Sequence, residues 1–165
     1  GSGSNFKAMN IAKFGEGRQN AKDYIEYQGF NAGSSVKNPD GYYGDPDDKI
    51  KNKDHLSNAK AQEWWRIADM FRNTYNAVNG KPYDTDNIIA ISSDCQHLDK
   101  LKTELSTPRR DFDTSGKVKV ESKKDLSARD VKSPNLADAF IMAYMNEAES
   151  TGHSGVYVPS RKRAR

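Results

Sequence analysis

One carboxylate interrupts the most apolar stretch of this sequence. Between Leu136 and Met145 every residue is apolar except Asp138. An ionised carboxylate in apolar surroundings is costly unless a cation or backbone N–H groups balance its charge. Two interpretations follow for Asp138. It binds a cation at a functional site, or it accepts hydrogen bonds from amides near the N-terminal end of its own helix, where the helix dipole favours negative charge.

The residues before this carboxylate predict where its helix begins. Ser133 and Pro134 are typical of the N-cap and the first position of a helix, so we expect the helix to start at Asn135. Further upstream, residues 113–116 predict a hairpin turn, followed by a strand over 117–121 that alternates basic residues with valine. One face of that strand is expected to be solvent-exposed and basic.

Basic residues gather on the hairpin and on the loop that leads to Asp138. Such side chains bind phosphate oxygens without reading the base sequence. We therefore predict contacts with a nucleic-acid backbone for Lys117, Lys119, Lys123, Lys124 and Arg129, joined by Arg109 and Arg110 beside the hairpin. The net charge of +3 permits such a partner without requiring it.

Other polar residues are weaker candidates for chemistry. Glu121 could orient a lysine or approach a metal ion, but placement at the surface is favoured, as it is for Asp125 and Asp130. The acids of the polar segment 34–55 lack the spacing of an EF-hand calcium loop, so we expect a long solvated loop there. The three histidines are scattered, and their spacing nominates no general base.

Periodicity in the first part of the chain predicts strands and helices in alternation. An apolar run over 6–14, a helical pattern that stops at Gly29 and an extended run after it are typical of a parallel βαβ unit. A continuous apolar stripe predicts a helix over 57–79, which Ser57 caps. Neighbouring side chains on a helix diverge by about 100°, so only one residue of the Trp-Trp pair is expected in the core.

The second part of the chain continues the same alternation. The apolar segment 87–92 predicts a buried strand. We expect Asp94 to cap the helix that follows, and Pro108 to end that helix. Together these elements predict an α/β fold, in which a mixed sheet carries helices on its faces.

The length and composition set the domain organisation. A single domain is expected over 5–150, preceded by a linker or tag remnant at 1–4 and followed by a basic flexible tail at 151–165. The lone Cys95 excludes an internal disulfide and a cysteine-rich zinc site. The sequence has no apolar run of the length that a membrane helix needs, and no signal-peptide pattern.

Several motifs occur in one order along the chain. They are the helix "SNAKAQEWWRIADMF", the Gly-Lys hairpin that leads into "ESK", and the helix that begins "SPNLADAF". In that order and spacing they resemble the C-terminal nuclease domain of the large terminase subunit of tailed bacteriophages, and "EGRQNAKDYIEYQGFNAGSS" is also similar to that family. The resemblance covers about residues 15–145, and the order is more specific than any single motif.

The resemblance implies an RNase H-like fold, with helices on both faces of the sheet. It also implies two-metal cleavage of DNA phosphodiesters, in which several carboxylates hold two Mg²⁺ or Mn²⁺ ions. Asp138 matches the last acid of the family's set, which makes it a candidate catalytic residue and metal ligand.

The sequence departs from the family at the other acids. The family's first acid lies on a strand before the βαβ unit, and residues 1–10 supply no such strand. Either the sequence given lacks that strand, which we expect, or an acid was replaced, or this homologue is degenerate. Its second acid precedes a Gly-x-Gly turn, where this chain has Ala12 or Lys13. Glu16, inside the turn, is the nearby substitute and thus a second candidate metal ligand. The implied metal site is therefore incomplete, with Asp138 as its one secure ligand.

The implied function is that of a DNA endonuclease domain in a phage genome-packaging terminase, which cuts concatemeric DNA at the procapsid in the host bacterial cytoplasm. The implied partners are double-stranded DNA, the terminase ATPase domain, the small terminase subunit and the portal protein, with no membrane. The alternative is a non-catalytic RNase H-like module that binds DNA or docks on the capsid. The Trp-Trp and Ser-Pro motifs argue against a third possibility, a resolvase or transposase core.

Overall fold

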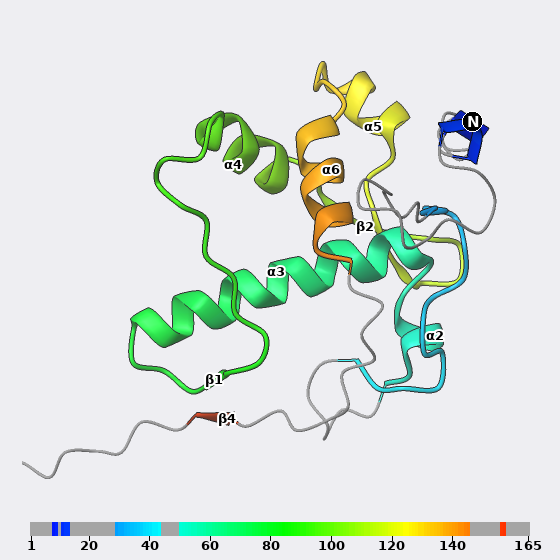
Figure 1. Cartoon of the computed structure of the whole chain (residues 1–165). Coiled ribbons are helices and arrows are strands. Elements are labelled where there is room, and N and C mark those ends of the chain that lie inside the picture. The colour runs from blue at the N-terminus through cyan, green and yellow to red at the C-terminus, as the bar shows by residue number, and fades with distance from the viewer. Residues whose placement is uncertain (1–7, 10, 14–28, 44–49, 146–155, 158–165) are drawn as a thin grey trace, which may run out of the picture. The chain divides into compact units, whose positions relative to one another are not determined.

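The computed structural model describes residues 8–9, 11–13, 29–43, 50–145 and 156–157 (Figure 1). The chain divides into two units, Gly1–Asn31 and Ala32–Arg165. In the first unit, residues 8–9 and 11–13 are helical, so the strand predicted over 6–14 is wrong. Ala8, Met9 and Ala12 favour a helix, and no sheet partner overrides that preference in the described part. The helix predicted after this run lies outside the described residues.

In the second unit, α3 (Ala59–Val78) is the longest helix. Its N-cap is Asn58, whose side chain accepts a hydrogen bond of 2.9 Å from the amide of Ala61, so the cap predicted at Ser57 is one residue early. Gly80 follows the helix with φ of 64°, a conformation that glycine adopts without strain. The predicted extent of this helix is confirmed.

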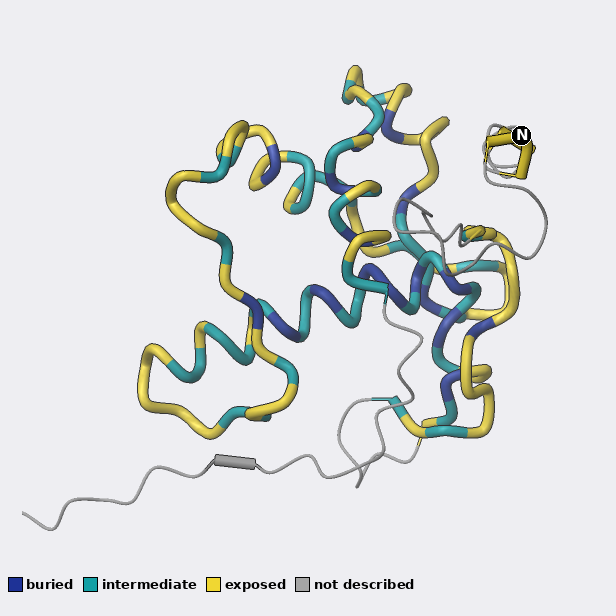
Figure 2. The backbone as a smooth tube through the Cα atoms, viewed as in Figure 1, coloured by how far each residue is buried: buried dark blue, intermediate teal, exposed yellow. Residues whose placement is uncertain are grey.

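One face of α3 forms the centre of the core (Figure 2). Trp64 is buried there while Trp65 remains partly exposed, which confirms that one tryptophan of the pair is core. One cluster of buried residues consists of Trp64, Ile67, Met70, Ile89, Ala137 and Ile141. A second cluster, against which Trp65 packs, consists of Val36, Leu56, Ala61 and Val118. The predicted apolar stripe of α3 is not buried along its whole length, because the side chains of Tyr75 and Val78 at the C-terminal end of the helix are exposed.

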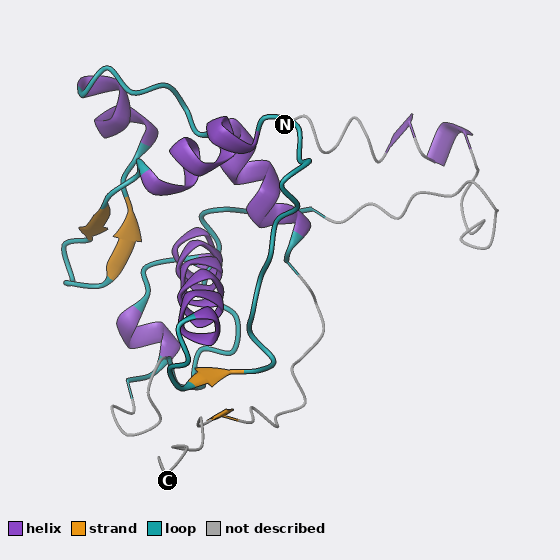
Figure 3. Cartoon of the chain, turned by 90° about the vertical axis from the view of Figure 1, so that its left-hand side faces the viewer, coloured by secondary structure: helices purple, strands orange, loops and turns teal. Residues whose placement is uncertain are grey.

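Four short strands form two antiparallel ladders among the described residues. β2 (Arg110–Phe112) pairs with β3 (Val118–Val120), with Asp111 opposite Lys119, and the predicted hairpin is confirmed. β1 (Tyr83–Asp84) pairs with β4 (Val156–Tyr157). Figure 3 shows that helices make up most of the regular structure of this unit. Within the described part, the α/β class is confirmed, but the sheet is smaller than predicted.

The segment 87–92 is not a strand. Its backbone groups find partners on α3 in place of a neighbouring strand: the Thr74 hydroxyl accepts a hydrogen bond of 2.9 Å from the Ile89 amide and donates one of 2.7 Å to the Ile89 carbonyl. The side-chain amide of Asn73 likewise donates to the carbonyl of Asn87 at 3.0 Å. Side chains of α3 therefore replace the sheet ladder, so the apolar run predicted as a strand packs as a loop. Residues 29–36 also form a loop, so the described residues contain no βαβ unit.

The described residues of this unit also form four shorter helices: α2 (Asn52–His55), α4 (Leu98–Ser106), α5 (Lys123–Ala128) and α6 (Asn135–Ala143). α4 ends before Pro108 as predicted, but His97 occupies its N-cap position, so the cap predicted at Asp94 is wrong. α6 packs against both α4 and α3 (Figure 1). Among the described residues, no helix combines the length and the apolar character needed to cross a membrane.

Candidate functional site

Asp138 lies in the first turn of α6, and its side chain is 22% exposed. Two ammonium groups flank the carboxylate. Lys60 of α3 places its Nζ 3.6 Å from Oδ1, and Lys123 of α5 places its Nζ 3.6 Å from Oδ2. The charge of Asp138 is therefore balanced by ammonium groups from two other elements. At 3.6 Å, neither contact is a close charge-assisted hydrogen bond.

Lys60 is a site residue that the sequence did not reveal. It lies in the first turn of α3, with its Nζ 5.6 Å from the centroid of the Trp64 ring and its side chain 20% exposed. The spacing of four residues between Lys60 and Trp64 predicts that contact on a helix. The contact with Asp138 depends on how α3 and α6 cross, and no local pattern encodes that.

The start of α6 differs from the prediction. Pro134 occupies the N-cap position and provides no side-chain cap, while the Ser133 hydroxyl donates a hydrogen bond of 2.8 Å to the side chain of Asn135. The first free amides are bound by Glu104 of α4, whose Oε2 accepts hydrogen bonds from Leu136 at 2.7 Å and Ala137 at 3.1 Å. The cap predicted at Ser133 is wrong, because a carboxylate from another helix takes its place.

Glu121 is buried, so its predicted placement at the surface is wrong. The guanidinium of Arg129 donates to both carboxylate oxygens, at 2.8 Å and 2.6 Å, and the amide of Arg109 donates to Oε2 at 3.0 Å. The hydrogen bonds from Arg129 hold the pKa of Glu121 below its ordinary value. The contact predicted between Arg129 and DNA must compete with this bidentate ion pair.

The basic residues predicted to bind DNA have unequal surroundings. On the hairpin, Lys119 pairs with Asp111 at 3.0 Å, and the amide of Lys117 donates to the carboxylate of Asp113 at 3.0 Å. These neighbouring acids reduce the positive charge of the face that the sequence predicts to be basic. Arg110 places its guanidinium 5.7 Å from the centroid of the Trp65 ring, within reach of a cation–π contact.

Five further residues near the hairpin and α5 complete the comparison with the prediction. Arg109 and Lys124 are exposed. Lys123 is also exposed, although its ammonium group lies at Asp138. Asp125 and Asp130 lie at the surface as predicted, but Asp125 belongs to the first turn of α5, not to a loop.

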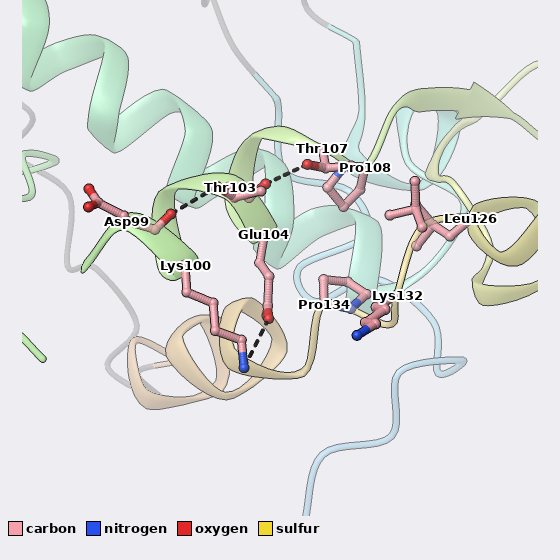
Figure 4. A pocket seen from close by; sticks show the side chains of 10 residues that line it. Asp99, Lys100, Thr103, Glu104, Thr107, Pro108, Leu126, Lys132 and Pro134 are labelled. Carbon is pink, nitrogen blue, oxygen red and sulfur yellow. Dashed lines mark hydrogen bonds and ion pairs between the residues drawn. The ribbon is translucent and has the colours of Figure 1, made fainter. Parts of the chain in front are cut away.

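A cavity of about 390 Å³ lies beside the start of α6. Residues from α4, from α5 and from the loop before α6 line it, including Thr103, Glu104, Leu126 and Pro134. Figure 4 shows Glu104 pointing from α4 toward the ammonium group of Lys100, close to that loop. The cavity therefore borders the cap of α6 and not the carboxylate of Asp138.

The described residues do not fit a two-metal centre. Within them, no group of three or more histidine, cysteine or acidic side chains is placed to hold a metal ion. Asp138 faces two ammonium groups. Hard divalent cations need several oxygen ligands, and this single carboxylate provides too few of them. Glu16 lies outside the described residues, whereas Ala12 and Lys13 are described as exposed helical residues.

Solved structures with a similar fold were found, whereas no family model and no curated protein matches the sequence. The nuclease domain of the large terminase subunit gp2 of bacterial virus Sf6 is 29% identical, with a TM-score of 0.64 over 72% of this chain and 53% of that chain. The chain has the fold of a terminase nuclease domain. The resemblance drawn from the sequence motifs is thus confirmed, and so is the RNase H-like fold class.

Other structures of the same terminase domain contain divalent metal ions. A mutant form with manganese is 30% identical, with a TM-score of 0.58 over 68% of this chain and 50% of that chain. Another, with manganese and beta-thujaplicinol, is 29% identical with a TM-score of 0.62 over 72% of this chain and 53% of that chain. This chain therefore spans about half the length of the terminase nuclease domains that it matches.

Proposed function

We propose that this chain is part of the DNA endonuclease domain of a phage genome-packaging terminase, which cleaves concatemeric viral DNA with Mg²⁺ or Mn²⁺. The observation that carries the proposal is the match to a terminase nuclease domain, at 29% identity over 72% of the chain. That domain was also solved with manganese and with calcium, which supports a role for divalent ions.

Asp138 is the proposed metal ligand and catalytic residue. Its carboxylate is partly exposed and its two ion pairs are loose, so an incoming cation can replace them at little cost. Two-metal hydrolysis needs several carboxylates around the ions. The described residues supply one such carboxylate, so the remaining ligands must come from outside them, with Glu16 as one candidate. The described residues alone do not support a cleavage step.

The DNA backbone is the proposed partner of the basic residues near the hairpin and α5. The better candidates are the exposed Arg109, Arg110 and Lys124 and the partly exposed Lys117, because Lys119 and Arg129 already have acidic partners. In the full system, the proposed partners are the terminase ATPase domain, the small terminase subunit and the portal protein. The proposed location is the procapsid in the cytoplasm of the host bacterium.

A second candidate function is a non-catalytic module of the same fold that binds DNA or the capsid. The observation that favours it is the pair of lysines at Asp138, together with the lack of a metal-binding cluster among the described residues. Such a module keeps its salt-dependent affinity for DNA when Asp138 is changed.

A cleavage assay separates the two functions. Supercoiled plasmid and Mn²⁺ are incubated with the chain, with Asp138→Ala, and with versions of both that are lengthened at the N-terminus by the family's first strand. Asp99→Ala is the matched control, because Asp99 is a fully exposed acid of the neighbouring helix α4. Nicking that Asp138→Ala abolishes and Asp99→Ala retains supports the nuclease. Intact plasmid in every reaction, with salt-sensitive DNA binding retained, contradicts it and supports the module.

A further inference from the structure

Glu104 holds the two backbone amides that come directly before Asp138. Its Oε2 accepts hydrogen bonds from Leu136 at 2.7 Å and from Ala137 at 3.1 Å, across 32 and 33 residues of sequence. The opposite oxygen, Oε1, lies 3.7 Å from the ammonium group of Lys100, one turn earlier on α4. The carboxylate of Glu104 is thus held mainly by the two amides, with a long ion pair at its other oxygen, and its side chain is only 15% exposed.

The first turn of α6 depends on this contact. Four amides at a helix N-terminus lack partners within the helix, and a cap normally satisfies some of them. The Asn135 amide donates to the carbonyl of Ser133, and the Asp138 amide donates to the carbonyl of Pro134. The two amides between them are those that Glu104 binds. Pro134 has no side-chain group to do so, and the hydroxyl of Ser133 is directed to another partner.

We propose that Glu104 is a positioning residue for Asp138. It fixes the first turn of α6 from outside the helix, and so sets where the Asp138 carboxylate lies between Lys60 and Lys123. The functional consequence rests on the proposed role of Asp138 as a metal ligand. Lys60 and Lys123 pair with Asp138, whereas Glu104 pairs with Lys100 and binds the amides of α6, so Glu104 acts on Asp138 through the backbone of α6.

The chemistry of the contact explains why a carboxylate is needed. Hydrogen bonds from amides to an ionised acceptor are roughly twice as strong as those between neutral groups. The negative charge is also favoured at the positive end of the helix dipole. A glutamine has the same length and keeps one acceptor oxygen, but it loses the charge. A Glu104→Gln variant therefore keeps the packing of the side chain while weakening the two hydrogen bonds.

The cavity beside α6 makes the contact sensitive to a change at this position. Glu104 lies on the wall of that cavity of about 390 Å³, so a shorter side chain there leaves the amides open to water (Figure 4). Solvent that enters on that side replaces the carboxylate with a mobile partner. We expect the first turn of α6 to fray in a Glu104→Ala variant, while the buried residues Ala137 and Ile141 keep the rest of the helix in place.

The test uses amide hydrogen exchange and NMR on the full chain. The variants are Glu104→Ala, Glu104→Gln and the control Asp99→Asn, which makes the same acid-to-amide change at an exposed position of the same helix. We expect exchange of the Leu136 and Ala137 amides to rise about fivefold in Glu104→Ala, by less in Glu104→Gln, and not at all in Asp99→Asn. Equal protection of the two amides in wild type and Glu104→Ala overturns the proposal.

A second measurement follows the Asp138 carboxyl carbon, first without metal and then as Mn²⁺ is added. The proposal requires its chemical shift to change in Glu104→Ala and to return part of the way to the wild-type value in Glu104→Gln. An unchanged shift in Glu104→Ala, with the amides exposed, overturns the positioning role and leaves Glu104 as a cap only. We expect Mn²⁺ to broaden the signal of the Asp138 carboxyl carbon in the wild type, and to broaden it several-fold less in Glu104→Ala. If Mn²⁺ broadens the wild-type signal neither in this chain nor in the chain lengthened at its N-terminus, the proposed function fails, while the metal-free shift and the exchange data still decide the positioning role.

Discussion

Two carboxylates of this chain, Glu121 and Asp138, follow the same basic hairpin but have opposite surroundings. Glu121 is 6% exposed and receives three hydrogen bonds, two of them from one guanidinium at 2.8 Å and 2.6 Å. Asp138 has a side chain that is 22% exposed, and its two ammonium partners stand at 3.6 Å. Both acids have cationic partners, but only the first is tightly bound.

The difference indicates which carboxylate is structural. A buried carboxylate with satisfied oxygens is costly to disturb, because removing one partner leaves an uncompensated charge. A partly exposed carboxylate with loose partners contributes little to folding and can exchange them for another cation. The short helix α5 connects the two environments, since Lys123 at its start forms an ion pair with Asp138 and Arg129 at its end forms one with Glu121.

The largest expected effect comes from breaking the tight pair. Glu121→Ala leaves the guanidinium of Arg129 and the amide of Arg109 without their acceptor, so we expect Tm to fall on the order of 5–10 °C. Thermal unfolding followed by circular dichroism measures the change. Glu121→Gln is the control. It keeps one acceptor oxygen, so its Tm is expected to lie between those of the wild type and Glu121→Ala. A Tm for Glu121→Ala equal to that of the wild type contradicts the structural role.

Acid titration tests the same pair without a mutation. The pKa of Glu121 is lowered in the folded chain, chiefly by the hydrogen bonds from Arg129, from an ordinary value of 4.5. Stability from this group is therefore complete above about pH 4.5 and is lost as the pH falls through the lowered value. Chemical denaturation at several pH values is expected to show this loss in the wild type and a weaker pH dependence in Arg129→Met. An equally steep loss in that variant would exclude Glu121 as its source.

A smaller effect is expected at the helix that joins the two carboxylates. The Ser122 hydroxyl caps α5 by accepting a hydrogen bond of 3.1 Å from the amide of Asp125. Ser122→Ala is expected to lower the free energy of unfolding by about 1 kcal/mol. Fraying at this end moves Lys123 before it moves Arg129, so the NMR signal of the Asp138 carboxyl group should shift more than that of the Arg129 guanidinium. A larger shift at the Arg129 guanidinium would show that the two sites do not respond independently.

The smallest effect on stability is expected at Asp138 itself. Asp138→Asn is expected to change the free energy of unfolding by no more than about 0.5 kcal/mol, because its ion pairs are partly exposed and long. Under the proposed function, the same change removes the broadening of neighbouring signals by Mn²⁺. Urea denaturation and Mn²⁺ titration measure the two quantities separately. A stability loss as large as that of Glu121→Ala would place Asp138 among the structural residues.

The successful predictions concern features that a few neighbouring residues encode. The hairpin follows from its turn residues, and α3 follows from the 3.6-residue period of its apolar side chains. The resemblance to terminase nuclease domains likewise rests on motifs that are short and ordered along the chain. The prediction for 87–92 fails because an apolar run does not show whether its backbone will bond to a strand or, as here, to Thr74.

The sequence by itself determined that Asp138 stands alone in an apolar helix and needs a cation or backbone amides to balance its charge. Only the tertiary structure decided which groups meet that need, since Lys60 and Lys123 reach the carboxylate from separate helices. The same holds for the start of α6, where Glu104 replaces the local cap expected at Ser133. Local patterns record the preference of each segment, whereas the partners of a buried or half-buried polar group depend on how distant helices pack.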